Sequence, residues 1–154
     1  MADDGLVRIE QFEPRYQQAT ATLINKGLGE RFGFIDESMN PDLYDIASNY
    51  ADATFLLAMV NQSVVGTGAL ISSEPSCGQI VRMHTAANHR RRGIASQILD
   101  ALEHRATQVG MQSLSLETNL DWDDAIQFYL RSGYAVLDRN HSGIRFQKVF
   151  SGGS

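Results

Sequence analysis

The fold of this 154-residue chain is decided by the stretch Gln79-Ile-Val-Arg-Met-His-Thr-Ala-Ala-Asn-His-Arg-Arg-Arg-Gly-Ile-Ala-Ser96. It predicts a strand over 79–85, a basic turn, and a helix that starts at Gly93 and runs to about Gly110. A further strand is expected over 113–118. Such a strand–helix–strand unit forms a right-handed crossover between two parallel strands. The apolar face of the helix recurs every four residues, at Ile94, Ile98, Leu102 and Ala106.

The start of this helix is suited to binding an anion. The first backbone N–H groups of a helix have no internal acceptor, and the helix dipole adds partial positive charge there. Gly93 allows close approach of the backbone, Ala95 keeps the first turn slim, and arginines at 90–92 add charge. The glycine patterns of nucleoside-triphosphate and dinucleotide loops are absent. An arginine-rich helix start is also typical of a solvated cap, so these residues alone leave both interpretations open.

The remaining elements surround this unit. Their order describes a mixed sheet with helices on its faces, in a single domain over residues 1–150 with a flexible tail at 151–154. We expect strands over 6–10, 54–60, 64–71, 134–137 and 144–149, a helix from Pro14 to about Leu28 that Gly27, Gly29 and Gly33 break up, and shorter helices over 43–50 and 123–132.

Composition and charge exclude several classes of protein. With 43% apolar and 20% charged residues the chain is neither disordered nor fibrous, and no apolar run approaches the roughly 18 residues of a membrane helix. Its net charge of −5 argues against general affinity for nucleic acid, and the one cysteine, Cys77, cannot form an internal disulfide. We therefore expect a cytoplasmic protein with no nucleic-acid, membrane or metal partner. Whether it forms a homodimer is left open.

Two segments of the chain resemble the signatures of the GNAT acetyltransferases. Arg90-Arg-Arg-Gly-Ile-Ala95 is similar to the family's Arg/Gln-x-x-Gly-x-Gly/Ala motif, and Ala125-Ile-Gln-Phe-Tyr-Leu-Arg-Ser-Gly-Tyr134 resembles its Ala-x-x-Phe-Tyr helix ending in Gly-Phe/Tyr. The resemblance covers about residues 64–137. It implies a mixed α/β fold: a mostly antiparallel sheet of six to seven strands, about four flanking helices, and a splay between the fourth and fifth strands.

The same resemblance implies the reaction and its residues. Acetyl-CoA would donate an acetyl group to a primary amine of a small molecule by direct attack in a ternary complex, without a metal. Tyr129 would protonate the departing thiolate, and Glu117 or His84 would take the proton of the amine. In place of an asparagine common in the family, this chain has Trp122. The residues expected to bind acetyl-CoA are Met83, His84, Thr85, Arg90, Arg91, Arg92, Gly93, Ile94, Ala95 and Ser96.

The segment 29–50 is expected to help form the acceptor pocket. Its acids, together with Phe32, Phe34 and Tyr44, suggest a cleft that favours a cationic amine, although a solvated acidic loop fits the sequence equally well. Three other functions stay open: a non-catalytic CoA or acyl-CoA sensor, transfer to a protein N-terminus or lysine, and a nucleic-acid contact through residues 88–92 that would weaken steeply with salt. The clustered acids are Glu30, Asp36, Glu37, Asp42, Asp45 and Asp52.

Overall fold

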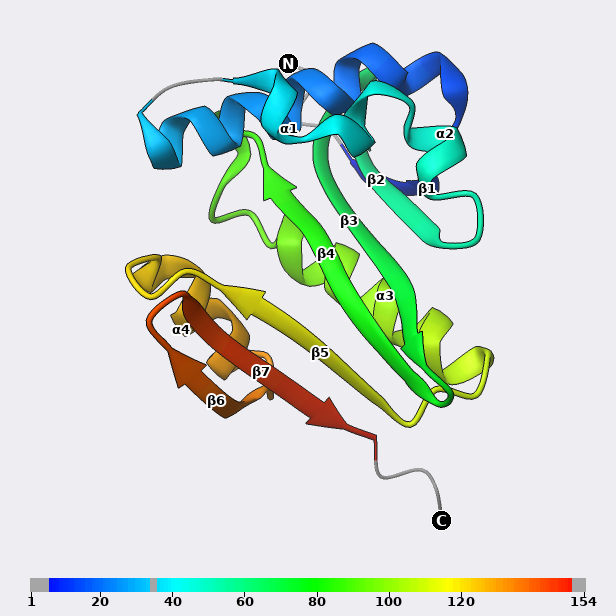
Figure 1. Ribbon diagram of the computed structural model, residues 1–154. Helices are drawn as coiled ribbons and strands as arrows, with labels where there is room; N and C mark the ends of the chain where they lie inside the picture. The colour runs from blue at the N-terminus through cyan, green and yellow to red at the C-terminus, as the bar shows by residue number, and fades with distance from the viewer. Residues whose placement is uncertain (1–5, 34–35, 151–154) are drawn as a thin grey trace.

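The computed structural model describes residues 6–33 and 36–150 and shows one mixed sheet with helices on both faces (Figure 1). The expected tail at 151–154 lies outside these residues. The spatial order of the strands is β1-β2-β3-β4-β5-β7-β6, and only β4 and β5 run parallel to each other. The strands are β1 (Val7–Gln11), β2 (Thr54–Val60), β3 (Ser63–Glu74), β4 (Cys77–Thr85), β5 (Ser113–Thr118), β6 (Ala135–Asn140) and β7 (Gly143–Val149).

Four α-helices accompany the sheet within the described residues, which together with the seven strands confirms the expected fold class. None of these helices combines the length and the apolar character needed to cross a membrane. The α-helices are α1 (Gln17–Phe32), α2 (Ile46–Asn49), α3 (Ile94–Gln108) and α4 (Asp123–Arg131), and short 3-10 turns span Pro14–Tyr16, Glu37–Met39, Pro41–Tyr44 and Ala87–His89.

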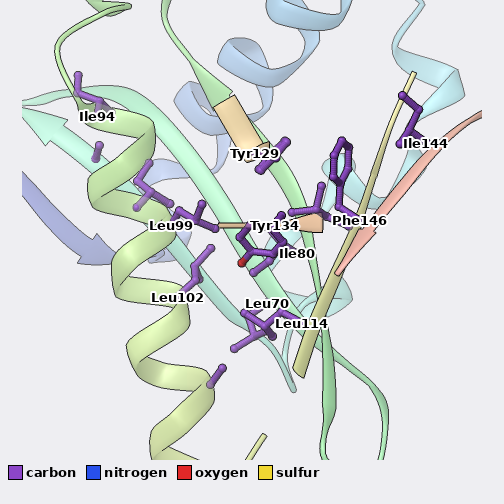
Figure 2. Packing of buried hydrophobic residues seen from close by; sticks show 14 of the residues in the cluster. Leu70, Ile80, Ile94, Leu99, Leu102, Leu114, Tyr129, Tyr134, Ile144 and Phe146 are labelled. Atoms are coloured by element: carbon purple, nitrogen blue, oxygen red, sulfur yellow. The ribbon is translucent and has the colours of Figure 1, made fainter. Parts of the chain in front are cut away.

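Two hydrophobic cores form on opposite faces of the sheet because alternate residues of a strand point to opposite sides. On β2, Leu57 packs with Ile24 of α1 and Ile46 of α2, whereas its neighbour Ala58 belongs to the core under α3 and α4. Figure 2 shows the second core, in which Leu99 of α3 lies over side chains from β3, β4 and β5. The apolar face predicted for α3 is buried along the whole helix, at Ile94, Ile98, Leu102 and Ala106.

Helix α1 is longer than the sequence suggested. Gly27 and Gly29 were expected to break it, but both lie inside it, and the helix ends in a left-handed turn at Gly33 (φ 84°). At Gly27 the helix passes so close to β4 that a side chain would crowd His84, because a Cβ atom there would lie 3.0 Å from Nδ1 of its imidazole. The glycine therefore lowers helix propensity but lets the helix lie against that imidazole.

A β-bulge interrupts the pairing of β3 with β4. The register passes from Thr67–His84 to Ala69–Val81, so two residues of β4 oppose one of β3, and Arg82 takes a left-handed backbone conformation (φ 58°). The hydroxyl of Thr67, itself buried, donates a hydrogen bond of 2.7 Å to the carbonyl of Arg82. Bulges bend and twist a strand, and this one lies where β4 leaves β5.

The parallel strands β4 and β5 pair at one end only. Their register runs from Cys77–Ser113 to Gln79–Ser115, and beyond that point β5 pairs with β7 alone (Figure 1). The expected splay between the fourth and fifth strands is therefore present. Along this gap, in the described part of the chain, the backbone of β4 from Ile80 onward lacks a strand partner on its β5 side.

Gly68, opposite the bulge, allows α3 to lie close to β3. A Cβ atom at this position would lie 2.6 Å from Cγ2 of Ile98 and 2.5 Å from Sδ of Met83. We expect Gly68→Ala to lower the free energy of unfolding by about 1–3 kcal/mol through overpacking, measured by chemical denaturation. The control Ser72→Ala, at an exposed position of the same strand, should change it by less than about 0.5 kcal/mol. Equal effects would contradict the close packing at Gly68.

Candidate functional site

Two adjoining cavities occupy the gap between β4 and β5. The splay cavity, of about 320 Å³, lies between β4 residues 80–84 and β5 residues 116–118 and is closed by the end of α1, the start of α4 and Ser142. The turn cavity, of about 180 Å³, lies beside the turn that precedes α3 and is lined by Thr85, Arg90 and Ala95 among others. Both cavities share five lining residues, which are Arg31, Met83, His84, Ala125 and Tyr129. A ligand filling both would pass these side chains.

Tyr129 lies at the junction of the two cavities. Helix α4 presents it to the core, where its ring packs against Tyr134 and Phe146 with 6.0 Å between ring centroids in each case (Figure 2). Only 7% of the residue is exposed. Burial raises the pKa of the phenol well above its ordinary value of 10. The hydroxyl therefore keeps its proton at neutral pH, which is the state that a proton donor requires.

His84 faces the same junction from β4. Burial lowers the pKa of its imidazole to about 4, and the positive charges of Arg82, Arg31 and Arg90 lower it in the same direction. At neutral pH the ring is therefore uncharged and has a nitrogen free to accept a proton. Gly27, by the close approach described above, provides the room that this ring occupies.

Glu117 lines the splay cavity from β5, and its side chain is exposed. Among the described residues that line this cavity it is the only carboxylate. Its register partner on β7 is Arg145, which forms an ion pair of 2.6 Å with Asp138. Over residues 6–33 and 36–150, no three His, Cys, Asp or Glu side chains gather in the way a metal site requires.

The turn before α3 presents unpaired backbone donors. Gly93 has φ 78°, and a Cβ atom added to it would meet no atom within 4 Å. The first hydrogen bond of the helix runs from the N–H of Gln97 to the carbonyl of Gly93, over 3.0 Å, so the N–H groups of residues 94–96 precede it. Ile94 has its side chain buried in the core, and only its backbone can face a ligand.

The three arginines of the motif point in different directions. Arg90 lines the turn cavity and forms an ion pair of 2.9 Å with Glu30 of α1. Arg91 is exposed and has a left-handed backbone (φ 66°), and Ser96 is exposed in the first turn of α3. Arg92 instead lines a separate surface hollow together with residues 88 and 89. The structure thus brings Met83, His84, Thr85, Arg90 and Ala95 together, but not the side chain of Arg92.

The acidic segment does not form the expected acidic cleft. Asp42 bonds to Arg82 at 2.7 Å and accepts a hydrogen bond from Tyr50, and Asp45 caps α2 through Ser48. None of the acids from 30 to 52 whose side chains are described lines the splay cavity. Phe34, also expected there, lies outside the described residues. Glu30 and Asp42 instead form ion pairs with arginines distant in the sequence, and Asp45 caps α2, roles for which the sequence gives no separate signal.

The sequence did not point to Arg31 as a site residue, because its partner Asp124 lies 93 residues further along the chain. Its Nη1 and Nη2 atoms donate hydrogen bonds of 2.8 and 3.1 Å to the two carboxylate oxygens of Asp124 on α4. The guanidinium lies 4.5 Å from the ring centroid of Trp122, and that ring also packs against Phe32 at 5.8 Å. Trp122, which replaces the family's asparagine, lines the splay cavity. Only folding brings α1 and α4 together across the gap.

The chain matches known acetyltransferases in sequence. The profile of the acetyltransferase (GNAT) family matches residues 20–134. YsnE of Bacillus subtilis, named an uncharacterized N-acetyltransferase, is 37% identical over 89 residues, which make up 56% of this chain and 59% of YsnE. The aminoalkylphosphonate N-acetyltransferase of Salmonella typhimurium is 30% identical over 124 residues, 77% of this chain and 71% of that protein. The chain spans about half to three fifths of most curated relatives it matches.

Solved structures share the fold. An acetyltransferase of the GNAT family from Staphylococcus aureus superposes with a TM-score of 0.86 at 22% identity, over 94% of this chain and 99% of that one. The PaiA N-acetyltransferase of Thermoplasma acidophilum, crystallised in complex with coenzyme A, superposes with a TM-score of 0.82 at 13% identity, over 95% and 100% of the two chains.

The depressed pKa of His84 predicts a specific pH dependence of stability. A histidine in the unfolded chain has a pKa near 6.5, so the unfolded chain binds this proton first as the pH falls. The stability associated with neutral His84 is therefore present above pH 6.5 and is lost as the pH falls towards 4. We expect His84→Gln to remove on the order of 1–3 kcal/mol of this pH-dependent change, measured by urea denaturation at several pH values.

The matched control is His104→Gln on the exposed side of α3, which should keep the pH dependence of the parent between pH 6.5 and 4. If the parent and His84→Gln lose stability in parallel over that range, the imidazole is not held in its neutral form by the fold.

Proposed function

Because the chain belongs to the GNAT acetyltransferase family and is therefore an acyltransferase, we propose that it transfers the acetyl group of acetyl-CoA to a primary amine of a small molecule. The observation that carries this proposal is the divergence of β4 from β5 beside the open turn at Gly93. Two substrates can meet there, because the splay cavity and the turn cavity adjoin at Tyr129 and His84. Direct transfer in a ternary complex needs such a meeting point.

The residues present fit coenzyme A at three places. The N–H groups of residues 94–96 and the left-handed turn at Gly93 would hold the diphosphate. The unpaired edge of β4, from Met83 to Thr85, would hydrogen-bond the pantetheine amides as an added strand does. Arg90 would add charge at the rim of the turn cavity. Acetyl-CoA supplies an activated acyl group as a thioester.

In this proposal Tyr129 donates a proton to the leaving group. When the amine nitrogen bonds to the acyl carbon and the carbon–sulfur bond breaks, the sulfur leaves with an electron pair and needs a proton. The buried phenol at the cavity junction holds one at neutral pH. A backbone N–H of β4 near Met83 would stabilise the charge that develops on the carbonyl oxygen.

The amine must lose protons as its new bond forms. An alkylammonium with a pKa of about 10.4 costs roughly 4–5 kcal/mol to deprotonate at pH 7 without help. His84 and Glu117 line the splay cavity from its two strands, and either can accept the proton directly or through water. His84 lines both cavities together with Tyr129, whereas Glu117 lines the splay cavity alone.

The size of the splay cavity, about 320 Å³, supports a small acceptor. The Salmonella relative is named for aminoalkylphosphonates, which are small amines. A cytoplasmic location stays a prediction from the sequence.

Thermal stabilisation by acetyl-CoA, followed by thiol release with a panel of amines, tests this function. The panel includes amino acids, polyamines, aminoglycosides and a peptide with a free N-terminus. We expect stabilisation by acetyl-CoA and thiol release with small amines. A protein that acetylates only the peptide would overturn the small-molecule acceptor, and one that acetyl-CoA does not stabilise would overturn the donor.

Removal of the Tyr129 hydroxyl tests its role as proton donor. We expect Tyr129→Phe to lower kcat by about 10²–10⁴-fold with an unchanged Kd for coenzyme A, from steady-state kinetics and calorimetry. The matched control is Tyr134→Phe in the same cluster. The hydroxyl of Tyr134 donates to Glu103 over 2.8 Å, so its loss should affect stability and leave kcat within a few-fold. Similar kcat values for the two variants would assign Tyr129 to packing alone.

A side chain at Gly93 should obstruct the diphosphate. Both Gly93 and Gly110 have positive φ, 78° and 87°, and neither has an atom within 4 Å of an added Cβ. Gly93→Val and Gly110→Val therefore carry a similar backbone strain of about 1–3 kcal/mol. We expect the first to weaken acetyl-CoA binding at least tenfold by calorimetry and the second to leave binding unchanged. Equal affinities would rule out a diphosphate site at this turn.

A further inference from the structure

The walls of the splay cavity carry more positive than negative charge. Two arginines, Arg31 and Arg82, line it, whereas Glu117 is the one carboxylate among its described lining residues. The aspartates that pair with the two arginines lie elsewhere: Asp42 is outside the lining, and Asp124 lines the turn cavity. An amine that carried only positive charge would meet two guanidinium groups in this cavity.

The arginines of the cavity wall also act on His84, which lines the same cavity. Burial is the first cause of its lowered pKa, and the charges of Arg82, Arg31 and Arg90 follow. Each of these arginines is also paired with a carboxylate, which offsets part of its charge. The remaining positive charge would attract an anionic group of a ligand and would favour the neutral, nucleophilic form of its amine.

Arg31 is the arginine best able to bind a ligand. Its side chain is 33% exposed and that of Asp124 is 70% exposed, so solvent competes for this ion pair. Arg82 and Asp42 are more enclosed, at 18% and 28%, and Arg82 also bonds to Asn40. The pair with Asp124 uses Nη1 and Nη2 of Arg31 and leaves its Nε–H for another acceptor. The guanidinium carbon lies 4.5 Å from the centroid of the Trp122 ring, and this cation–π contact helps to hold the group at the cavity wall.

We propose that the acceptor is a small amine that also carries an oxyanion, a carboxylate or a phosphonate, a few bonds from its nitrogen, and that Arg31 binds this oxyanion in the splay cavity. The amine would then face His84 and Tyr129 at the junction of the cavities. This proposal rests on the proposed acetyl transfer and narrows its acceptor class. A guanidinium suits either oxyanion, because both offer two oxygens in one plane to its N–H groups.

Matched acceptors test the class. Thiol release from acetyl-CoA is measured with L-phenylalanine against 2-phenylethylamine, and with 2-aminoethylphosphonate against ethylamine. We expect kcat/KM to be at least tenfold higher for the acidic member of one or both pairs than for its amine partner. The pair with the larger ratio shows whether the site prefers a carboxylate or a phosphonate. Equal or higher values for both amines without the acid would overturn the proposal.

Two variants separate ligand binding from a structural ion pair. Arg31→Gln removes the guanidinium and should raise KM for the better acidic acceptor at least tenfold, with little change for its amine partner. Asp124→Asn breaks the same ion pair but keeps the guanidinium, so KM should stay unchanged or fall. If both variants raise KM equally, Arg31 acts only by holding α1 to α4. Arg15→Gln, from the exposed pair with Glu13, is the control and should leave KM unchanged.

Calorimetry distinguishes failure of this proposal from failure of the proposed function. The protein with bound coenzyme A is titrated with L-phenylalanine and with 2-aminoethylphosphonate. If no amine is acetylated but an acid binds and Arg31→Gln abolishes its binding, the oxyanion site stands and the acetyl transfer does not. If thiol is released with other amines and neither acid binds, the acetyl transfer stands and the oxyanion site is overturned.

Discussion

The parallel strands β4 and β5 share only three residue pairs, from Cys77–Ser113 to Gln79–Ser115, and the site depends on where that pairing stops. A buried strand edge normally pairs its N–H and C=O groups, since leaving them without partners costs free energy. Here the edge opens onto two cavities instead, and a ligand with its own amides can complete the sheet. The bulge at Arg82, supported by the Thr67 hydroxyl, bends β4 at the start of this opening.

The opening is bounded by elements that are distant in sequence. Helix α1 approaches β4 through Gly27, beside His84, and its last turn reaches α4 through Arg31 and Asp124. From the other face, α4 presents Tyr129 from within the aromatic core. The proposed proton donor and the proposed proton acceptor thus lie at one junction, where burial keeps the phenol protonated and the imidazole neutral at pH 7.

The sequence predicted the parts of this arrangement that local pattern encodes. The stripe of α3, the strand before it and the short amphipathic α4 all formed where expected, and the Gly93 turn lies between them. Prediction from the sequence failed where contacts between distant elements decide the structure. A glycine such as Gly27 predicts a break in α1, and the sequence does not show that His84 lies against this position in the fold. The acids of 30–52 suggested an acidic cleft for a cationic amine, but Asp45 caps α2, Asp42 pairs with Arg82, and arginines line the cavity instead.

Amide hydrogen exchange with and without acetyl-CoA tests the central claim most directly, because the claim concerns backbone groups. The account predicts that acetyl-CoA slows exchange at residues 83–85, on the open edge of β4, and at 94–96, in the first turn of α3, with little change at the paired segment 113–115. Protection confined to other surfaces, such as the hollow beside Arg92, with unchanged exchange at both of these segments, would contradict it.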